Sequence, residues 1–217
     1  MIPTTIRFRE DIVRESPTMR NLGVVFDKNL SWDSHVSALV KKCNGILIGL
    51  SHVRHQIPPS LLPIIVDALV ISHVRYCLTV FGNGSEKNMQ RLQKILNFGL
   101  RAVSGRRKFD HISDVRDELG WLTARQLYEL QSLNLLHKIR TTEEPQALAS
   151  RLSTNSEFRS RNTRQDADLA LPRVRTEAGK RRFLYSIAQR YNELPLDLRE
   201  ASLASFKRQL GDVLQDA

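Results

Sequence analysis

The chain has 217 residues, of which 41% are hydrophobic, 26% charged and 6% aromatic, and it contains two cysteines. This composition is that of a globular protein with a core, and it excludes the disordered, collagen-like and low-complexity classes. Two cysteines cannot form a disulfide framework, and no apolar run approaches the roughly 20 residues that a membrane helix needs. We therefore expect an intracellular protein without membrane contact, located in the cytoplasm, the nucleus or both.

The net charge of +10 and the isoelectric point near 10.1 indicate a polyanionic partner. The positive charge is concentrated in residues 85–109, which contain seven basic side chains and a single acidic one, Glu86. Residues 141–182 show a weaker excess of basic over acidic side chains. This uneven distribution favours a binding surface over a general contribution to solubility.

The first third of the chain is predicted to change from strands to helices. Residues 2–30 contain short alternating and β-branched runs, which predict a small β-hairpin or a pair of strands. From Ser31, a residue type favoured at helix N-caps, apolar residues recur with a helical period to about residue 55. A second helix is predicted over residues 58–81, where a Gly-Asn-Gly segment ends it.

Capping patterns predict the next helices. A serine N-cap opens a third helix over residues 85–103, and Gly105 ends it. A short acidic helix follows around residues 113–119. Thr123 and Gln126 have the spacing of a capping box, which predicts a helix that continues to about residue 140.

Beyond that helix the periodic pattern is lost and then returns. A further helix is predicted from Thr176, and a last amphipathic helix is predicted after Ser202. The expected fold class is mainly α: a helical bundle preceded by a small N-terminal β-hairpin, with an irregular linker before the last two helices. The expected parts are a β element (1–30), a helical domain (31–140), an irregular basic linker (141–175) and a C-terminal helical pair (176–217).

The predicted helix over residues 85–103 is the most informative segment for function. Its apolar side chains form one stripe, and the opposite stripe consists of Lys87, Arg91, Lys94, Phe98 and Arg101. The basic run after the helix extends this stripe with Arg106, Arg107 and Lys108. Cations that neutralise phosphates beside an aromatic ring that stacks on a base are typical of nucleic-acid binding. The alternative is a solvated helix face on which Phe98 packs against a neighbouring element.

No catalytic, metal or cofactor site is expected. His73 and Cys77, like His52 and His55, have helical spacing, but the four ligands of a zinc site are not recognisable. Acidic residues around 110–118 are of the type that two-metal enzymes use, but the helix dipole also favours acids in a first turn. The sequence has no Asp-Asp pair and no common hydrolase or nucleotide-binding motif, so we expect no small-molecule substrate.

Several segments resemble one known family. NLGVVFDKNLSWDSHV, at residues 21–36, is similar to the segment after the catalytic palm in reverse transcriptases of non-LTR retrotransposons, in the jockey-like and chicken-repeat-like group. Three further segments resemble the family and follow in the same order as in the family: ISHVRYCLTVFGN, LQKILNFGLRAVSGRRKFDHISDV and LGWLTARQLYELQSLNLLHKI. RYNELPLDLREASLASFKRQL then resembles the terminal box of the family, with Tyr191 where Trp is usual. The resemblance covers roughly residues 18–214.

The resemblance implies a C-terminal fragment that comprises the last palm strands, the thumb and the post-thumb helices. Such a fragment would bind an RNA or DNA template–primer duplex without sequence preference, and the missing palm domain would be a second partner. The family's catalytic carboxylates lie in the palm and map to no residue here, so no polymerase activity is expected from the fragment alone. Two alternatives stay open: part of an active reverse transcriptase whose palm is missing from the gene model, or a domesticated helical module that binds a protein.

Overall fold

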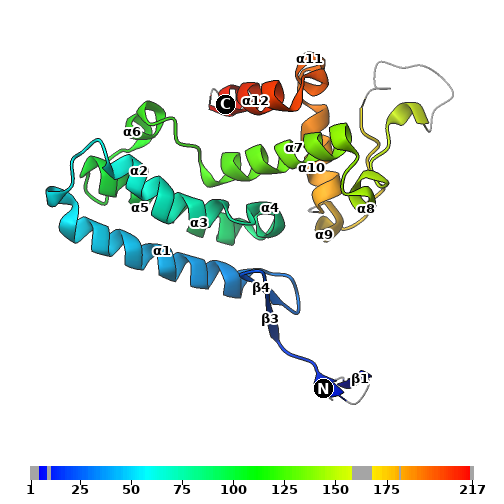
Figure 1. Cartoon of the computed structure of the whole chain (residues 1–217), viewed down its shortest axis with the longest axis horizontal. Helices are drawn as coiled ribbons and strands as arrows, with labels where there is room; N and C mark the ends of the chain where they lie inside the picture. The colour runs from blue at the N-terminus through cyan, green and yellow to red at the C-terminus, as the bar shows by residue number, and fades with distance from the viewer. Residues whose placement is uncertain (1–4, 9–10, 158–167, 181, 216–217) are drawn as a thin grey trace.

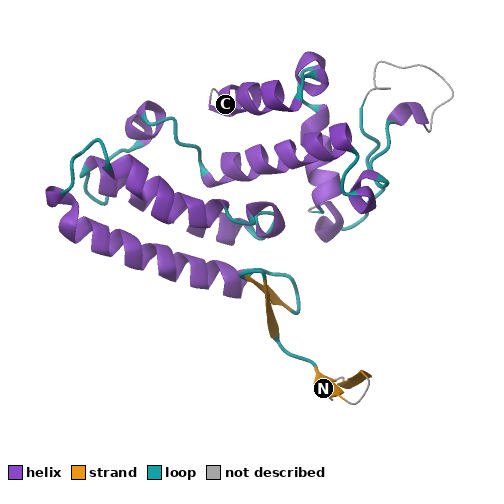
Figure 2. Cartoon of the chain, viewed as in Figure 1, coloured by secondary structure: helices purple, strands orange, loops and turns teal. Residues whose placement is uncertain are grey.

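The computed structural model describes residues 5–8, 11–157, 168–180 and 182–215. Helices dominate these residues, and the strands lie at the N-terminal end, so the predicted fold class is confirmed. Figures 1 and 2 show a helical body from which two small hairpins extend. Residues 158–167, in the middle of the predicted linker, lie outside the described residues, as do residues 1–4 of the predicted β element.

The N-terminal β element consists of two antiparallel hairpins rather than the one predicted. The pairs are β1 (Thr5–Phe8) with β2 (Asp11–Arg14), and β3 (Thr18–Asn21) with β4 (Val24–Asp27). The second hairpin turns at Leu22 and Gly23, whose positive φ values of 46° and 83° suit the twist of paired strands. The two hairpins form separate two-stranded sheets.

Two long helices, α1 (Asp33–Val53) and α5 (Glu86–Ser104), pack side by side and run in the same direction. At the start of α5, the Asn88 amide donates to the Ser31 carbonyl at 3.1 Å and to an Asp33 carboxylate oxygen at 2.8 Å. At the other end, the Arg54 guanidinium donates to the Val103 carbonyl at 3.4 Å. Between these contacts α1 buries the stripe that its period predicted: Val36, Leu39, Cys43, Leu47 and Leu50.

The predicted caps are confirmed. The Ser85 hydroxyl accepts a hydrogen bond from the backbone N–H of Asn88, and Gly105 ends α5 with a left-handed φ of 75°. Thr123 and Gln126 form the reciprocal capping box that opens α7 (Ala124–Thr142). The short acidic helix is α6 (Ser113–Glu118).

The prediction of a single helix over residues 58–81 is wrong. After the 3₁₀ turn η1 (Arg54–Gln56), this region forms α2 (Leu62–Val66), the π-helical segment η2 (Asp67–Ile71), α3 (Ser72–Arg75) and α4 (Leu78–Phe81). Its fully buried side chains recur every four residues: Val66, Val70, Val74 and Leu78. A strict four-residue interval is longer than the 3.6 residues of one α-helical turn. A wider π turn therefore keeps these side chains on one face of the helical segment. The helix then breaks at Cys77, which has a left-handed φ of 56°.

The described C-terminal residues form more helices than the pair predicted. The short elements α8 (Gln146–Ala149) and η3 (Asn155–Glu157) precede α9 (Glu177–Lys180), α10 (Phe183–Asn192), α11 (Leu196–Glu200) and α12 (Leu203–Gln215). Pro195 is the N-cap residue of α11, and its carbonyl accepts a hydrogen bond from the Arg199 N–H at 3.1 Å.

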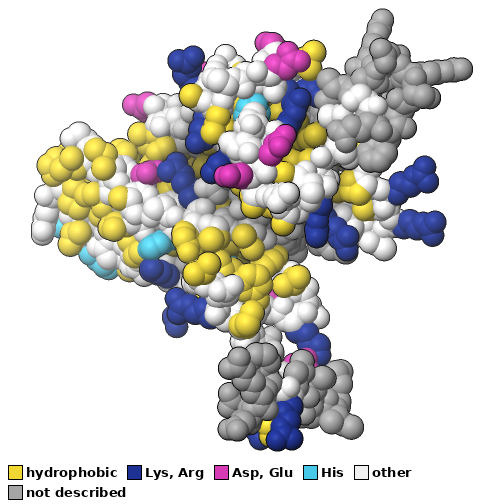
Figure 3. All heavy atoms as spheres, turned by 45° about the vertical axis from the view of Figure 1, so that its right-hand side comes forward, with side chains coloured by type: hydrophobic (Ala, Val, Ile, Leu, Met, Phe, Trp, Pro, Cys, Tyr) yellow, Lys and Arg dark blue, Asp and Glu magenta, His cyan; other side chains and the backbone are white. Residues whose placement is uncertain are grey.

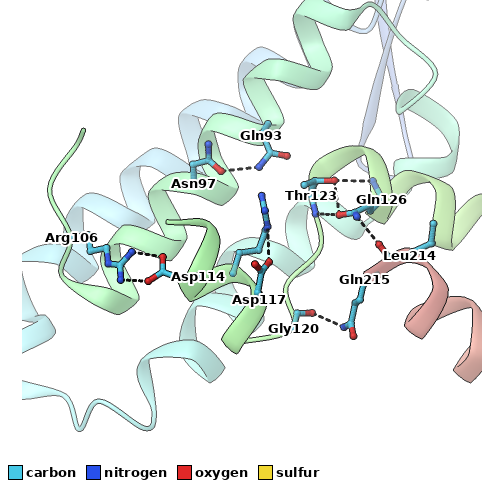
Figure 4. Close-up of polar contacts among 11 residues, drawn as sticks. Gln93, Asn97, Arg106, Asp114, Asp117, Gly120, Thr123, Gln126, Leu214 and Gln215 are labelled. Carbon is cyan, nitrogen blue, oxygen red and sulfur yellow. Dashed lines mark hydrogen bonds and ion pairs between the residues drawn. The ribbon is translucent and has the colours of Figure 1, made fainter. Parts of the chain in front are cut away.

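Helix α7 connects the two halves of the helical body. Helices α5 and α4 pack against it, and so do α10 and α12 from the C-terminal part. The Gln126 amide donates to the Leu214 carbonyl at 2.6 Å, and the Gln215 amide donates to the Gly120 carbonyl at 3.0 Å (Figure 4). Buried apolar side chains from Val24 to Leu214 therefore belong to one continuous cluster.

A buried histidine fixes α7 against the C-terminal helices. The His137 ring stacks on Phe206 with centroids 3.9 Å apart. Its Nε2 lies 3.1 Å from the Ala201 carbonyl, which can only accept, so Nε2 carries the proton. Nδ1 lies 2.9 Å from the Tyr191 hydroxyl, which itself donates to the Arg199 carbonyl at 3.2 Å. Burial lowers the pKa of His137 below its usual value and so favours the neutral imidazole.

We expect the free energy of unfolding to fall as the pH is lowered below 6.5. Burial lowers the pKa of His137, and also that of His35 under β4, from the usual 6.5. Below that pH the unfolded chain therefore binds more protons than the folded chain. The decrease is at most about 1.4 kcal/mol per pH unit for each imidazole. Urea unfolding followed by circular dichroism between about pH 5 and pH 8 measures it.

A variant tests whether His137 contributes to this pH dependence of the free energy of unfolding. His137→Gln removes one titrating imidazole and should make the dependence shallower, while the contribution of His35 remains. His52→Gln, at an exposed position of α1, is the matched control and should keep the wild-type dependence. An unchanged dependence in His137→Gln would contradict the assignment.

We expect amide hydrogens of β1 and β2 to exchange faster than those of β3 and β4. An isolated two-stranded hairpin is marginally stable in water. The second hairpin is anchored, because Val24 is buried, the Val25 N–H donates to His35 Nδ1, and the Tyr76 hydroxyl donates to the Leu22 carbonyl. Hydrogen exchange followed by NMR tests this order, and equal protection of the two hairpins would refute it.

Candidate nucleic-acid interface

The predicted basic stripe on α5 borders the groove between α5 and α1. Lys87 and Lys94 are exposed, whereas Arg91 and Arg101 are half-buried. The Arg91 guanidinium reaches across to α1, where it donates to the Ser37 hydroxyl at 2.9 Å. It also donates to the Asn88 side-chain oxygen at 3.3 Å. Arg91 therefore keeps its charge at the groove while it holds the two helices together.

Helix α1 adds a cation that the stripe analysis did not include. Lys41 follows Ser37 by four residues, so it lies on the side of α1 that receives Arg91. Its side chain is exposed. The basic surface is thus built from two helices that are about 50 residues apart in sequence.

Phe98 lies at the edge of the core. Its side chain is half-buried and packs against the apolar cluster, as the alternative interpretation of the stripe expected. Its remaining surface lines a cavity of about 790 Å³ between the end of α1 and the C-terminal half of α5. The cavity is lined by Ser51, Arg54, Lys94, Asn97, Phe98, Arg101, Ala102, Gly105, Arg106 and Lys108.

Arg101 shapes the loop that carries the remaining predicted cations. Its guanidinium donates to the carbonyls of Asn97, Arg107 and Asp110, at 3.3, 3.1 and 3.4 Å. These bonds fold the loop after Gly105 back toward the helix. Carbonyls do not neutralise a guanidinium, so Arg101 holds the loop and still contributes a positive charge.

The three cations of this loop have different surroundings. Arg106 forms a two-pronged ion pair with Asp114 of α6, seen in Figure 4, and this pairing holds the pKa of Asp114 below its ordinary value. Arg107 is exposed; its backbone N–H donates to the Asp110 carboxylate at 2.7 Å, and its carbonyl accepts from Arg101. The Lys108 ammonium lies 5.3 Å from the centre of the exposed Phe109 ring. Arg106 therefore contributes less positive charge than the sequence predicted.

Arg54 is a cavity residue that sequence reasoning missed. Its guanidinium occupies the space beside Gly105, where the Cβ of any other residue would clash with it. From the sequence alone, a basic residue at the end of α1 is expected to interact with the helix dipole. No local signal shows that Arg54 meets a turn some 50 residues further along the chain.

The cations of this surface have no acidic partners. No described carboxylate forms an ion pair with Lys87, Arg91, Lys94, Arg101, Arg107, Lys108 or Arg54. Glu86, the one acid of the segment, is engaged by Arg125 of α7. Lys and Arg also occur at several separate places on the face in Figure 3, and other cations of the chain, such as Lys138 and Lys207, are also without an ion pair among the described residues. What marks the site is therefore the clustering of unpaired cations on two neighbouring helices.

The acidic residues near the site are engaged in local contacts. Asp114 pairs with Arg106, Asp117 pairs with Arg116, and Asp110 accepts from the Arg107 backbone. Among the described residues, no three His, Cys, Asp or Glu side chains gather where they could hold a metal ion. Within the same residues, every helix is too short or too polar to cross a membrane.

These observations describe a surface of uncompensated cations, with a half-buried aromatic ring in an adjoining cavity. Comparison of the chain with protein-family models, with curated proteins and with solved structures finds no match.

Proposed function

We propose that the chain binds nucleic acid through the basic surface of α1 and α5, as the C-terminal part of a reverse transcriptase of the non-LTR retrotransposon type. The surface consists of Lys41 on α1, Lys87, Arg91, Lys94 and Arg101 on α5, and Arg107 and Lys108 in the loop after α5. Its ligand is the phosphate backbone of a template–primer duplex. The resemblance of residues 18–214 to that family supports the assignment.

The observation that carries the proposal is the cluster of cations without ion pairs on this surface. Like charges at helical spacing, such as Lys87 and Arg91, destabilise a helix slightly. A face that only had to be solvated would gain stability from acids mixed among the bases. Here the described carboxylates pair with other arginines, and the surface keeps its charge for a polyanion.

The phosphate backbone is the part of nucleic acid that such a surface can bind. Lysine and arginine side chains that contact phosphates position a protein without reading the base sequence. Binding should therefore be nearly independent of sequence and should weaken log-linearly with salt concentration.

A protein-binding module is the second candidate, and exposed apolar side chains on α2 and the π-helical segment favour it. Ile64 is 63% exposed and Leu69 is 48% exposed. Salt separates the two functions, because apolar contact with a protein lacks the steep, log-linear salt dependence of phosphate binding.

We expect the triple change Lys87→Gln, Lys94→Gln and Lys108→Gln to weaken duplex binding. Three lost phosphate contacts should flatten the plot of log affinity against log salt by about 2 to 3 units on B-form DNA. Helix α5 should survive, because Gln forms helices almost as well as Lys. Fluorescence anisotropy with a labelled duplex at several salt concentrations measures both effects, and circular dichroism checks the fold.

The matched control removes the same charge elsewhere. Lys138, Lys207 and Arg208 are exposed on α7 and α12, and none of them forms an ion pair with a described carboxylate. Their replacement by Gln should change the salt slope by less than about one unit. Equal losses from both triple variants would show general attraction to a polycation, and no loss from the first triple variant would refute the proposed surface.

We expect no primer extension by the purified chain on an RNA template with divalent metal. Two-metal phosphoryl transfer requires clustered acidic ligands, and no described group of three acidic, His or Cys side chains provides them. Template-dependent extension by protein free of contaminating polymerase would overturn this expectation. Addition of a separately produced palm domain tests whether the chain completes an active polymerase.

A further inference from the structure

The cavity at the C-terminal end of α5 points to a more specific ligand than a duplex backbone. We propose that it binds a single unpaired nucleotide, with the phosphate held by the lining cations and the base placed against the Phe98 ring. The nucleotide would come from the unpaired end of a bound nucleic-acid strand, so the inference rests on the proposed function.

The lining of the cavity is built for an anion. Arg54, Lys94, Arg101 and Lys108 converge on it from α1, α5 and the following loop. Their head groups are donors only, and no carboxylate belongs to the described lining. A phosphate supplies the acceptors that such a group of donors requires.

Asn97 adds a neutral donor whose orientation is fixed by its neighbours. The Ala124 N–H donates to the side-chain oxygen of Gln93 at 2.8 Å. The Gln93 amide nitrogen therefore donates to the Asn97 side-chain oxygen, also at 2.8 Å, as Figure 4 shows. The amide nitrogen of Asn97 forms no hydrogen bond that involves a described residue, so it can donate to a base or a phosphate.

Phe98 and two small residues make the cavity suitable for a base. Ala102 adds a small apolar side chain to the lining beside Phe98, and the absence of a side chain at Gly105 makes room for the Arg54 guanidinium. The volume of about 790 Å³ lies within the range of about 300 to 1,000 Å³ found for small-ligand pockets. A base inside a duplex is paired and stacked on its neighbours, so only an unpaired base can reach the ring.

The test compares two DNA duplexes that carry the same short single-stranded extension, one with adenine bases and one with abasic sites. Both extensions have the same phosphates, so the affinity ratio reports the base alone. Stacking of one base on an aromatic side chain predicts a ratio of about fivefold or more for the full chain. Deoxyadenosine monophosphate, titrated alone, tests whether a free nucleotide occupies the cavity.

Three variants locate the effect. Ser51 is an exposed lining residue whose hydroxyl bonds only to its own helix, so Ser51→Glu places a carboxylate in the cavity without breaking a contact between helices. Phe98→Leu keeps an apolar side chain but removes the flat ring. Both should reduce the ratio to near one. Ser34→Glu, on the exposed first turn of α1, has the same charge change outside the cavity and should retain the ratio.

The outcomes distinguish this inference from the proposed function. A base-dependent ratio, or binding of the monophosphate, that Ser51→Glu abolishes and Ser34→Glu retains supports the cavity as a nucleotide site. Monophosphate binding without any duplex binding would support the cavity and refute the proposed function. A ratio near one together with no monophosphate binding would overturn the inference, even if the duplex binds.

Discussion

The parallel contact between α1 and α5 is the interaction on which the rest of the structure depends. It buries the main apolar stripes of both helices and is closed at its two ends by Asn88 and Arg54. The orientation of α5 about its axis then follows, because its apolar side has to face α1 and α7. The lysines and arginines of α5 are left along the groove between α5 and α1, where Arg91 reaches Ser37.

The charge on that groove is not required by the fold. An amphipathic helix needs a polar outer face, but mixed charges would serve the helix better than cations alone. The nearby acids are used elsewhere, since Glu86 meets Arg125 and Asp114 meets Arg106. At the start of the two helices Asp33 accepts from the Asn88 amide and Glu86 pairs with Arg125, so the lysines and arginines further along α5 and α1 have no carboxylate partner among the described residues. This is the arrangement that a phosphate backbone would require.

The second half of the molecule is held to the first by buried polar groups as well as by apolar packing. His137 connects α7 to Tyr191 and to the Ala201 carbonyl, and Phe206 stacks on its ring. Buried polar groups that satisfy one another specify a single arrangement of the helices, because any displacement leaves a donor or acceptor without a partner. Burial among these groups favours the neutral form of the His137 imidazole where α10 and α12 attach to α7.

The sequence by itself determined the helices whose signals are local. Ser85, Gly105 and the Thr123–Gln126 capping box marked the helix ends correctly, because caps depend on residues within one turn of each other. The uncompensated basic face of α5 was also visible, since charge and helical period are properties of the sequence. Tertiary structure decided the rest. The π turn and the left-handed Cys77 arise from side chains that must fit a common core, and Arg54 reaches the cavity only because α1 and α5 run in parallel. Such contacts join residues far apart in the chain, and no local pattern encodes them.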